Sequence, residues 1–489
     1  MQAASLWWNR VSAWLVFARA DRRAPSYRDV LLEGDLQPHL RAIAAREQTS
    51  GYARMRAPGA LVAQLTRGIG LLNHVPVADQ LPAAAWLSDN GRFLQEEAAA
   101  LGQELRQCAR LPKDSTGQPR ILVLARELMG HRNAELDLPL LKTAVAAWQQ
   151  VEPLSEPEIS ALPLALRAAL MELVVGLMLQ ALRDQQHFSE APVMARLLSG
   201  GKTLTAAKRL PTYQQNGAFL VRLLSLLHES EDAEALRWLE QQLGTAEGEL
   251  ENLVGPEHDR QAENRRWIGN AITSLRLLSR IPWQRELEQM SLLHRELCRD
   301  DTYRDMDEES RAYYRARTVR MSRQTGVNEL MIARAALALS QAEPPESISA
   351  HVGYYLLDEG RLLLLGRLPD PTARARGYRY WQRHSFGLYR LGNWVGLLLL
   401  LLVGWVARLP WWMLLPFAVT LLHPLRQLSE ALLRRLCPPK MVPRLKLSYL
   451  PDELKTLVVC PTMLQSREHA IRMVKHLSIL QQANPDPNL

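Results

Sequence analysis

The chain has 489 residues, of which 47% are hydrophobic and 22% are charged, and its formal net charge at pH 7 is +8. This length suffices for about three domains, and the composition is that of folded protein, which excludes a disordered chain. Much of the positive excess lies beside one apolar stretch near the C-terminus. We attribute it to membrane topology and contact with anionic lipid, and we expect no nucleic acid partner.

The sequence of residues 1–80 predicts an N-terminal helical segment that is interrupted by prolines. Within it, residues 6–17 form an amphipathic pattern that fits either an interfacial helix or a core helix of a soluble region. The apolar part contains Arg10, and no small-residue cleavage site follows, so we predict no cleavable signal peptide.

Residues 81–370 predict an irregular, all-helical array, because strand-type alternation is missing and no fixed-period repeat is found. One helix is expected from Pro82 to Leu111 and Pro112. Asp137 and Pro139 predict the start of another, as a capping acceptor followed by a proline in the first turn. Its buried face would carry Leu140, Leu141, Ala144, Val145 and Trp148.

Ser155 and Glu158 form a capping box at the start of a further helix. Residues 168–182 of this helix are strongly apolar, which favours a core helix and leaves a membrane helix as the alternative. Leucines follow the cap at alternating spacings of four and three, as on a packed helix face. These leucines are Leu166, Leu170, Leu173 and Leu177.

Further helices are expected at residues 231–243, 260–280, 285–299 and 307–323. The last of them is rich in charge, which predicts a solvated or partner-facing helix. The helix at 260–280 would bury Ile268, Ala271, Ile272, Leu275 and Leu278.

The chain contains none of the common catalytic or phosphate-binding motifs. We interpret the carboxylate pairs Asp300–Asp301 and Asp358–Glu359 as solvated helix faces, and His131 as a structural or capping histidine rather than a general base. We therefore assign no catalytic residue and no metal ligand. Four cysteines without a CxxC pair fit a reducing cytosol and predict neither a zinc site nor a disulfide framework, and they are Cys108, Cys298, Cys437 and Cys460.

Residues 371–440 predict a transmembrane helical hairpin with basic flanks. Two apolar limbs, 391–407 and 409–425, fall slightly short of the roughly 20 residues of a spanning helix and meet at Arg408 and Pro410. The alternatives are a single long helix with a buried Arg408 and a buried helical hairpin of a soluble core.

Positive charge on both flanks favours the hairpin, because the cytoplasmic ends of membrane spans collect lysine and arginine. A single span would place one cluster on the wrong side, whereas a hairpin keeps both in the cytoplasm and exposes only the turn at Arg408. The clusters are Arg374, Arg376, Arg379, Arg383 and Arg390 before the hairpin, and Arg426, Arg434, Arg435, Lys440, Arg444 and Lys446 after it.

Residues 441–489 change character. A short β-branched run at 455–462 predicts a strand, and 466–480 predict a helix. One strand and one helix form only the start of an α/β domain, since they cannot bury both faces alone. The expected fold class is mainly α: an irregular helical array, one transmembrane hairpin and an incomplete α/β start.

Several stretches, taken in order, resemble motifs of the cyclic β-1,2-glucan synthases. One departure is Ala85, where the family pattern has an acidic residue. The stretches are Trp86-Leu-Ser-Asp-Asn90, Ala125-Arg-Glu-Leu-Met-Gly-His131, Asn270-Ala-Ile-Thr-Ser-Leu-Arg276, Tyr303 with Met306 and Asp307, His351-Val-Gly-Tyr-Tyr-Leu-Leu-Asp358-Glu-Gly-Arg361, and Thr456-Leu-Val-Val-Cys-Pro-Thr462.

The resemblance implies the N-terminal part of a very large bacterial inner-membrane enzyme with a cytoplasmic helical region. A membrane hairpin would lead into a glycosyltransferase domain that uses UDP-glucose, followed by phosphorylase-like domains. In such transferases the loop after the first strand touches the uridine, which carries over to Pro461, Thr462 and Met463. The metal-binding aspartates lie further along in the family, so we expect no cofactor in this chain, Mg²⁺ only in the complete enzyme, and no transferase activity from the chain alone.

Two functional hypotheses follow. The chain is either a membrane-anchoring and regulatory or assembly part of such a synthase, or a standalone membrane-anchored helical scaffold that binds a protein partner or glucan. The incomplete α/β start favours the synthase, because a scaffold has no use for it.

Overall fold

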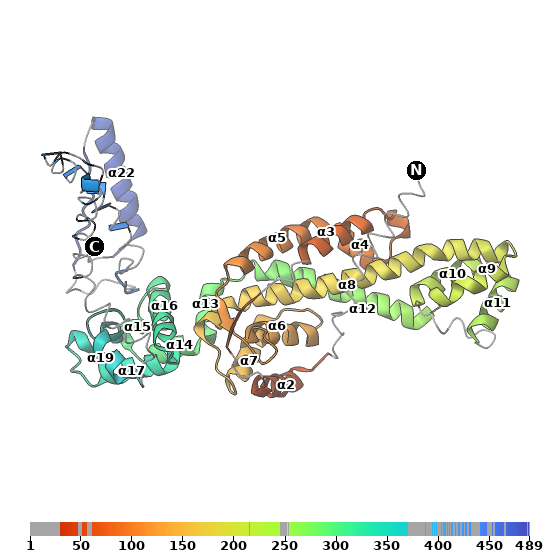
Figure 1. The fold of residues 1–489 in the computed structure, drawn as a ribbon, viewed down its shortest axis with the longest axis horizontal. Coiled ribbons are helices and arrows are strands. Elements are labelled where there is room, and N and C mark those ends of the chain that lie inside the picture. The colour runs from red at the N-terminus through yellow and green to blue at the C-terminus, as the bar shows by residue number, and fades with distance from the viewer. Residues whose placement is uncertain are drawn as a thin grey trace. The chain divides into compact units, whose positions relative to one another are not determined.

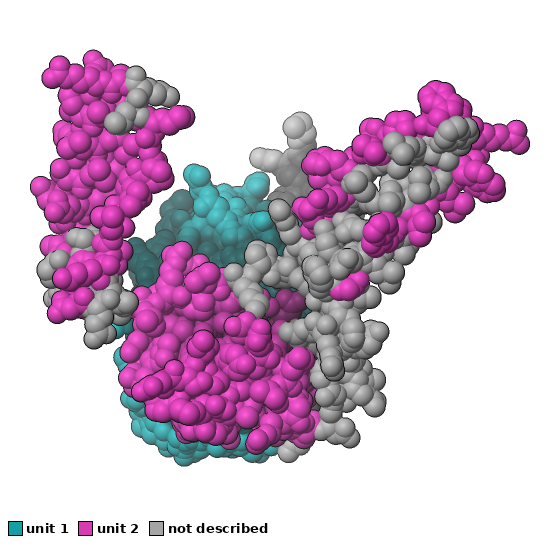
Figure 2. Space-filling view, turned by 90° about the vertical axis from the view of Figure 1, so that its left-hand side faces the viewer, with its two compact units in different colours: residues 1–292 teal, residues 293–489 magenta. Residues whose placement is uncertain are grey.

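The computed structural model describes residues 30–46, 51–55 and 61–369, except 215, 245–251 and 253. Beyond these it describes isolated residues from 387 to 431, and then 441–446, 452, 455–463, 466–486 and 488. The amphipathic segment expected at 6–17 lies outside the described residues. The chain divides into two compact units, residues 1–292 and 293–489, which Figure 2 colours separately.

Unit 1 is organised around α8 (Glu156–Ser199), a helix of 44 residues that packs against α3, α6, α10 and α12 (Figure 1). Its elements are α2 (Glu33–Arg46), β1 (Tyr52–Arg54), α3 (Leu61–Leu72), η1 (Val77–Asp79), α4 (Pro82–Asp89), α5 (Gly91–Gln107), β2 (Arg110–Pro112), α6 (Arg120–His131), α7 (Leu138–Gln149), α8, α9 (Thr203–Arg209), η2 (Leu210–Thr212), α10 (Gly217–Glu229), α11 (Ala233–Leu243), α12 (Val254–Leu278) and α13 (Trp283–Met290).

The capping box that starts α8 is confirmed, because the Ser155 N–H donates to Glu158 Oε2 at 2.8 Å. Among the described residues, α8 is the helix that is long and apolar enough to cross a membrane. However, 67% of its most apolar window is buried inside the structure. This burial fits the core helix that the sequence favours.

The apolar faces predicted for two further helices are confirmed. In α7 the side chain of Trp148 is fully buried together with the rest of the expected face. In α12 the five residues expected to be buried, from Ile268 to Leu278, all lie in the core. Asp137 does occupy the N-cap of α7, but its side chain makes no capping hydrogen bond.

Two of the predicted helices are each divided into two. The helix expected from Pro82 to Pro112 is broken at Asn90, whose side-chain amide donates to the Trp86 carbonyl at 2.9 Å and so competes with the helical pattern. The helix expected at 285–299 is divided between α13 and α14 (Leu292–Leu297) by the extended backbone of Ser291.

The region is not all-helical, because β1 and β2 form a two-stranded antiparallel sheet in which Ala53 faces Leu111. Each strand has three residues. Runs this short carry too little alternation for the sequence to reveal them, and the pairing joins segments far apart in the chain.

Unit 2 contains a second helical core. The helix α16 was expected to be solvated or partner-facing, but its residues Tyr314, Thr318 and Met321 are buried in this core. The helices of the core are α14, α15 (Asp301–Arg304), α16 (Glu308–Thr325), α17 (Glu329–Gln341), η4 (Ile348–Ala350), α18 (Val352–Leu357) and α19 (Arg361–Arg367).

A segment after the expected hairpin, residues 441–446, returns to this helical core. Met306 and Leu445 form an antiparallel bridge, and the N–H of Asp307 donates to the carbonyl of Arg444 at 3.0 Å. The residues before and after the apolar stretch therefore belong to the same unit.

The tail carries the predicted helix as α22 (Arg467–Ala483), with Ser466 at its N-cap. No strand is formed within the described residues 455–463. The N–H of Thr456 instead donates to the Asn488 carbonyl at 2.8 Å. A β-branched run becomes a strand only when a neighbouring strand supplies the ladder, and within the described part of the tail none does.

Candidate functional site

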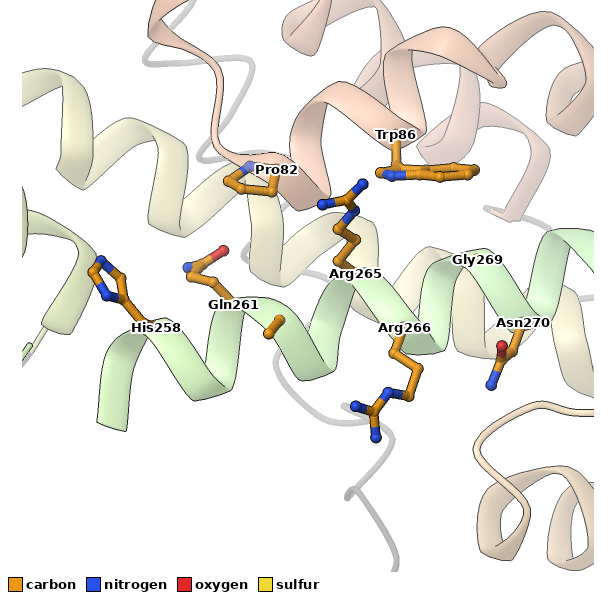
Figure 3. A pocket seen from close by; sticks show the side chains of 9 residues that line it. Pro82, Trp86, His258, Gln261, Arg265, Arg266, Gly269 and Asn270 are labelled. Atoms are coloured by element: carbon orange, nitrogen blue, oxygen red, sulfur yellow. The ribbon is translucent and has the colours of Figure 1, made fainter. Parts of the chain in front are cut away.

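A groove of about 540 Å³ lies between α4 and α12 on unit 1. Gln261 and Arg265 project from α12 toward Pro82 and Trp86 on α4 (Figure 3). Trp86 is 37% exposed, and the Arg265 guanidinium carbon lies 5.9 Å from the centre of its indole ring. The remaining lining residues are His258, Ala262, Arg266, Gly269 and Asn270.

The lining gives this groove a defined chemistry. Trp86 offers a large, flat apolar surface, and the arginine, glutamine and asparagine side chains around it offer several hydrogen-bond donors. A flat aromatic surface beside fixed donors suits a polyhydroxylated ligand, whose ring packs on the aromatic face while its hydroxyls bind the donors.

The motif residues on α12 hold one wall of the groove in place. The Asn270 amide donates to the Asn133 carbonyl at 3.1 Å, and the Ser274 hydroxyl donates to the Ala134 carbonyl at 2.8 Å. Asn133 and Ala134 both have positive φ angles, 51° and 59°, a conformation that asparagine tolerates but that is costly for alanine. The two side chains therefore stabilise a strained turn after α6.

The other wall is held by Arg276, which donates to Asn90 Oδ1 at 2.9 Å and lies 5.0 Å from the centre of the Phe93 ring. Asn90 belongs to the same motif as Trp86. Two stretches that are 186 residues apart thus meet, and the motifs position the groove rather than form a catalytic set.

A buried polar cluster in unit 2 joins two more of the motif stretches. His351 Nδ1 lies 3.0 Å from Asp300 Oδ1, and the hydroxyl of Tyr314 lies 2.8 Å from His351 Nε2. The N–H groups of Val352 and Tyr303 donate to the same carboxylate at 2.8 and 2.9 Å. Asp300 is therefore buried, which corrects its interpretation as part of a solvated face, whereas Asp301, Asp358 and Glu359 are exposed.

This order of carboxylate, imidazole and hydroxyl resembles a catalytic relay, but its electrostatics indicate a structural role. Burial raises the pKa of Tyr314 well above its ordinary value, and the charge of Asp300 raises it further, so the hydroxyl stays protonated. Only 2% of Tyr314 is exposed, which leaves a substrate no access. Gly353 packs directly against the Tyr314 hydroxyl and the His351 ring, where a larger residue would collide.

The expected site residues belong neither to the groove nor to the polar cluster around Asp300. Pro461, Thr462 and Met463 are exposed at the end of the extended segment of the tail. Arg408 is exposed and lies in a turn. The other arginines assigned to topology, Arg374, Arg376, Arg379, Arg383, Arg390, Arg434 and Arg435, lie outside the described residues.

A comparison with known proteins finds the cyclic beta-(1,2)-glucan synthase NdvB of Rhizobium meliloti (strain 1021), which is 23% identical to this chain over 433 residues. The alignment covers 83% of this chain and 15% of the relative, so the chain spans about 15% of the length of the protein it matches. No family model matches the chain. The chain is a distant relative of this synthase, which confirms the resemblance seen in the motifs.

Proposed function

We propose that this chain forms the N-terminal helical and membrane-anchoring part of a glucosyltransferase that is similar to the cyclic β-(1,2)-glucan synthases and uses UDP-glucose. The observation that carries the proposal is the alignment with such a synthase, which extends through most of the chain. The helical units would lie in the cytoplasm of a bacterium, and the apolar stretch would anchor them in the inner membrane.

Two contacts support a hairpin for this anchor. The helical core of unit 2 ends at α19, before the apolar stretch, and residues 441–446, after the stretch, bind to the same core. Both ends of the stretch are therefore on the same side of any membrane that it enters, so the stretch must cross that membrane an even number of times. Arg408 has a φ of 55°, and its N–H donates to the Trp405 carbonyl at 2.9 Å. A left-handed residue interrupts a helix, so this turn disfavours a single long span.

Gene disruption in the source bacterium tests the proposal. Loss of the chain is expected to abolish cyclic β-1,2-glucan synthesis, and expression of the full chain is expected to restore it. A variant that lacks residues 391–425 is expected to leave the membrane fraction and not to restore synthesis. Glucan levels that survive the disruption unchanged would contradict the proposal and favour the standalone scaffold.

A second candidate function, glucan binding, is favoured by the groove beside Trp86. Sugar rings pack on exposed indole faces, and Arg265 and Gln261 stand next to this one with hydrogen-bond donors. A part of the enzyme that holds glucan would act as a guide for the product and would not need a catalytic residue of its own.

Replacing Trp86 by alanine is expected to weaken the binding of a β-1,2-linked glucan oligosaccharide at least about tenfold, or ~1.4 kcal/mol, because tryptophan dominates such contacts. Calorimetric titration of the full chain in detergent measures the affinity. Leu277→Ala is the control, since Leu277 is 39% exposed on the same helix and does not line the groove. Equal affinities for the two variants, or no binding by the wild type, would rule out the groove.

A further inference from the structure

Three side chains that can ligate metals converge where α2 packs on α6. His39 projects from α2, and Glu127 and His131 lie one turn apart on α6. Glu127 Oε2 lies 3.0 Å from His39 Nε2 and 3.6 Å from His131 Nε2. One ligand atom from each residue falls within 4.8 Å of the other two.

This geometry is close to that of an occupied metal site. Zinc binds imidazole nitrogen and carboxylate oxygen at about 2.0–2.2 Å, which places tetrahedral ligand atoms about 3.3 Å from one another. The two nitrogen–oxygen separations, 3.0 and 3.6 Å, lie on either side of that value, and the two histidine ligand atoms lie within 4.8 Å of each other. The two imidazole rings meet edge to face, with centres 4.6 Å apart, so both nitrogens reach the same carboxylate oxygen without a ring clash.

The two histidines approach the shared carboxylate at different distances. The 3.0 Å contact between His39 and Glu127 is an ordinary hydrogen bond, but 3.6 Å from His131 to Glu127 is too long for one. Glu127 and His131 are buried, with side chains 9% and 10% exposed, whereas the His39 side chain is 35% exposed. Burying a carboxylate is costly, and a divalent cation shared with two imidazoles offsets that cost.

We propose that His39, Glu127 and His131 form a binding site for a first-row divalent transition metal such as Zn²⁺. Two imidazoles and one carboxylate are the donor set that such ions prefer over Mg²⁺ or Ca²⁺. The exposed side at His39 leaves the fourth position open to water. The metal ties α2 to α6, next to the point where the Leu31 N–H donates to the His131 carbonyl at 3.2 Å.

The sequence contains half of this signal. Glu127 and His131 stand at a spacing of four on a helix, which puts them on one face. The third ligand, His39, is 88 residues away from Glu127 and becomes a neighbour only through the packing of α2. For this reason the sequence predicts a structural role for His131 and no metal.

The test is a Zn²⁺ titration of the full chain in detergent, stripped of metal and followed with a chromophoric chelator as competitor. The wild type is expected to bind one equivalent of Zn²⁺. His39→Ala and His131→Ala are each expected to weaken Zn²⁺ binding at least about 100-fold, which is more than the usual loss when a residue that only supports a ligand is removed. His228→Ala is the control, because the His228 ring bonds only to the Leu224 carbonyl of its own helix among the described contacts.

Folding is checked in the same samples. His39 is the partly exposed ligand, so His39→Ala is expected to keep the helical circular dichroism of the wild type while it loses both the Zn²⁺ affinity and the rise in melting temperature that Zn²⁺ produces. Wild-type protein without stoichiometric Zn²⁺ binding would overturn the proposal. Binding that persists unchanged in His39→Ala and His131→Ala would overturn it as well, since the ion would then lie elsewhere.

Discussion

Replacing Glu158 by alanine is expected to lower the free energy of unfolding around α6 and α8 by about 3–5 kcal/mol, the usual cost of breaking a buried ion pair. Glu158 is completely buried, and Arg120, 2% exposed, donates to both of its carboxylate oxygens at 3.1 and 2.9 Å. Burial alone would lower the pKa of Arg120, but Glu158 and Glu152 raise it above its ordinary value. The guanidinium therefore stays charged, and the variant leaves it with Glu152 as its remaining carboxylate partner.

The same substitution removes the Glu158 half of the capping box of α8, since Glu158 also accepts the Ser155 N–H at 2.8 Å. Hydrogen exchange of the α6 and α8 amides in the full chain measures the loss of stability. Because exchange reports on each segment, the stability of unit 1 is measured separately from that of the rest of the protein. Arg92→Ala is the control, because the Arg92–Glu96 pair is exposed at 91% and 66% and should contribute nothing measurable. Equal protection in the two variants would contradict the prediction.

Local sequence patterns predicted much of unit 1. The capping box at Ser155 and the apolar face of α7 depend on residues within one or two turns, so a short window contains the whole signal. Where a side chain competes with the helix, as Asn90 does through its bond to the Trp86 carbonyl, periodicity alone does not reveal the break.

The candidate sites were less predictable, because each is built by residues far apart in the chain. Trp86 and Asn270 stand out in motifs, yet only the packing of α12 on α4 brings them to two walls of one groove. Asp300 lies in a charged stretch that predicts exposure, and its burial follows from a partner 51 residues later. A pattern of charge describes composition, whereas burial depends on the tertiary contacts of each residue.

Replacing Asp300 by alanine is expected to destabilise the helical core of unit 2 by about 3–5 kcal/mol. The carboxylate accepts hydrogen bonds from His351 and from the N–H groups of Val352 and Tyr303. Loss of an N-cap alone costs about 0.5–2 kcal/mol, and each hydrogen bond to a charged group is worth about 1.5–3 kcal/mol. Asp301→Ala is the matched control, since its side chain is 82% exposed and pairs only with Arg304 among the described contacts.

The stabilisation by Asp300 should depend on pH in a defined direction. Burial by itself would raise the pKa of Asp300, but the hydrogen bonds from His351, Val352 and Tyr303 outweigh burial and lower it. The unfolded chain has a pKa of about 3.9 at this position, so the stabilisation is fully present above that pH and is lost as the pH falls through the lower pKa of the folded state. The other polar groups of this cluster are Tyr314, Arg315 and His294.

Hydrogen exchange of the α15 and α18 amides, corrected for the intrinsic effect of pH, tests this dependence. The difference in protection between wild type and Asp300→Asn should be largest at pH 5 and above. This difference in protection should become smaller below pH 4, because Asp300 is then protonated and the wild type, like the asparagine variant, has no charge at this position. A gap that stays constant down to pH 2 would mean that the carboxylate acts through its shape rather than its charge. The cluster would then be held by packing around Tyr314 and Gly353, and the pKa of Asp300 would not be lower in the folded protein than in the unfolded chain.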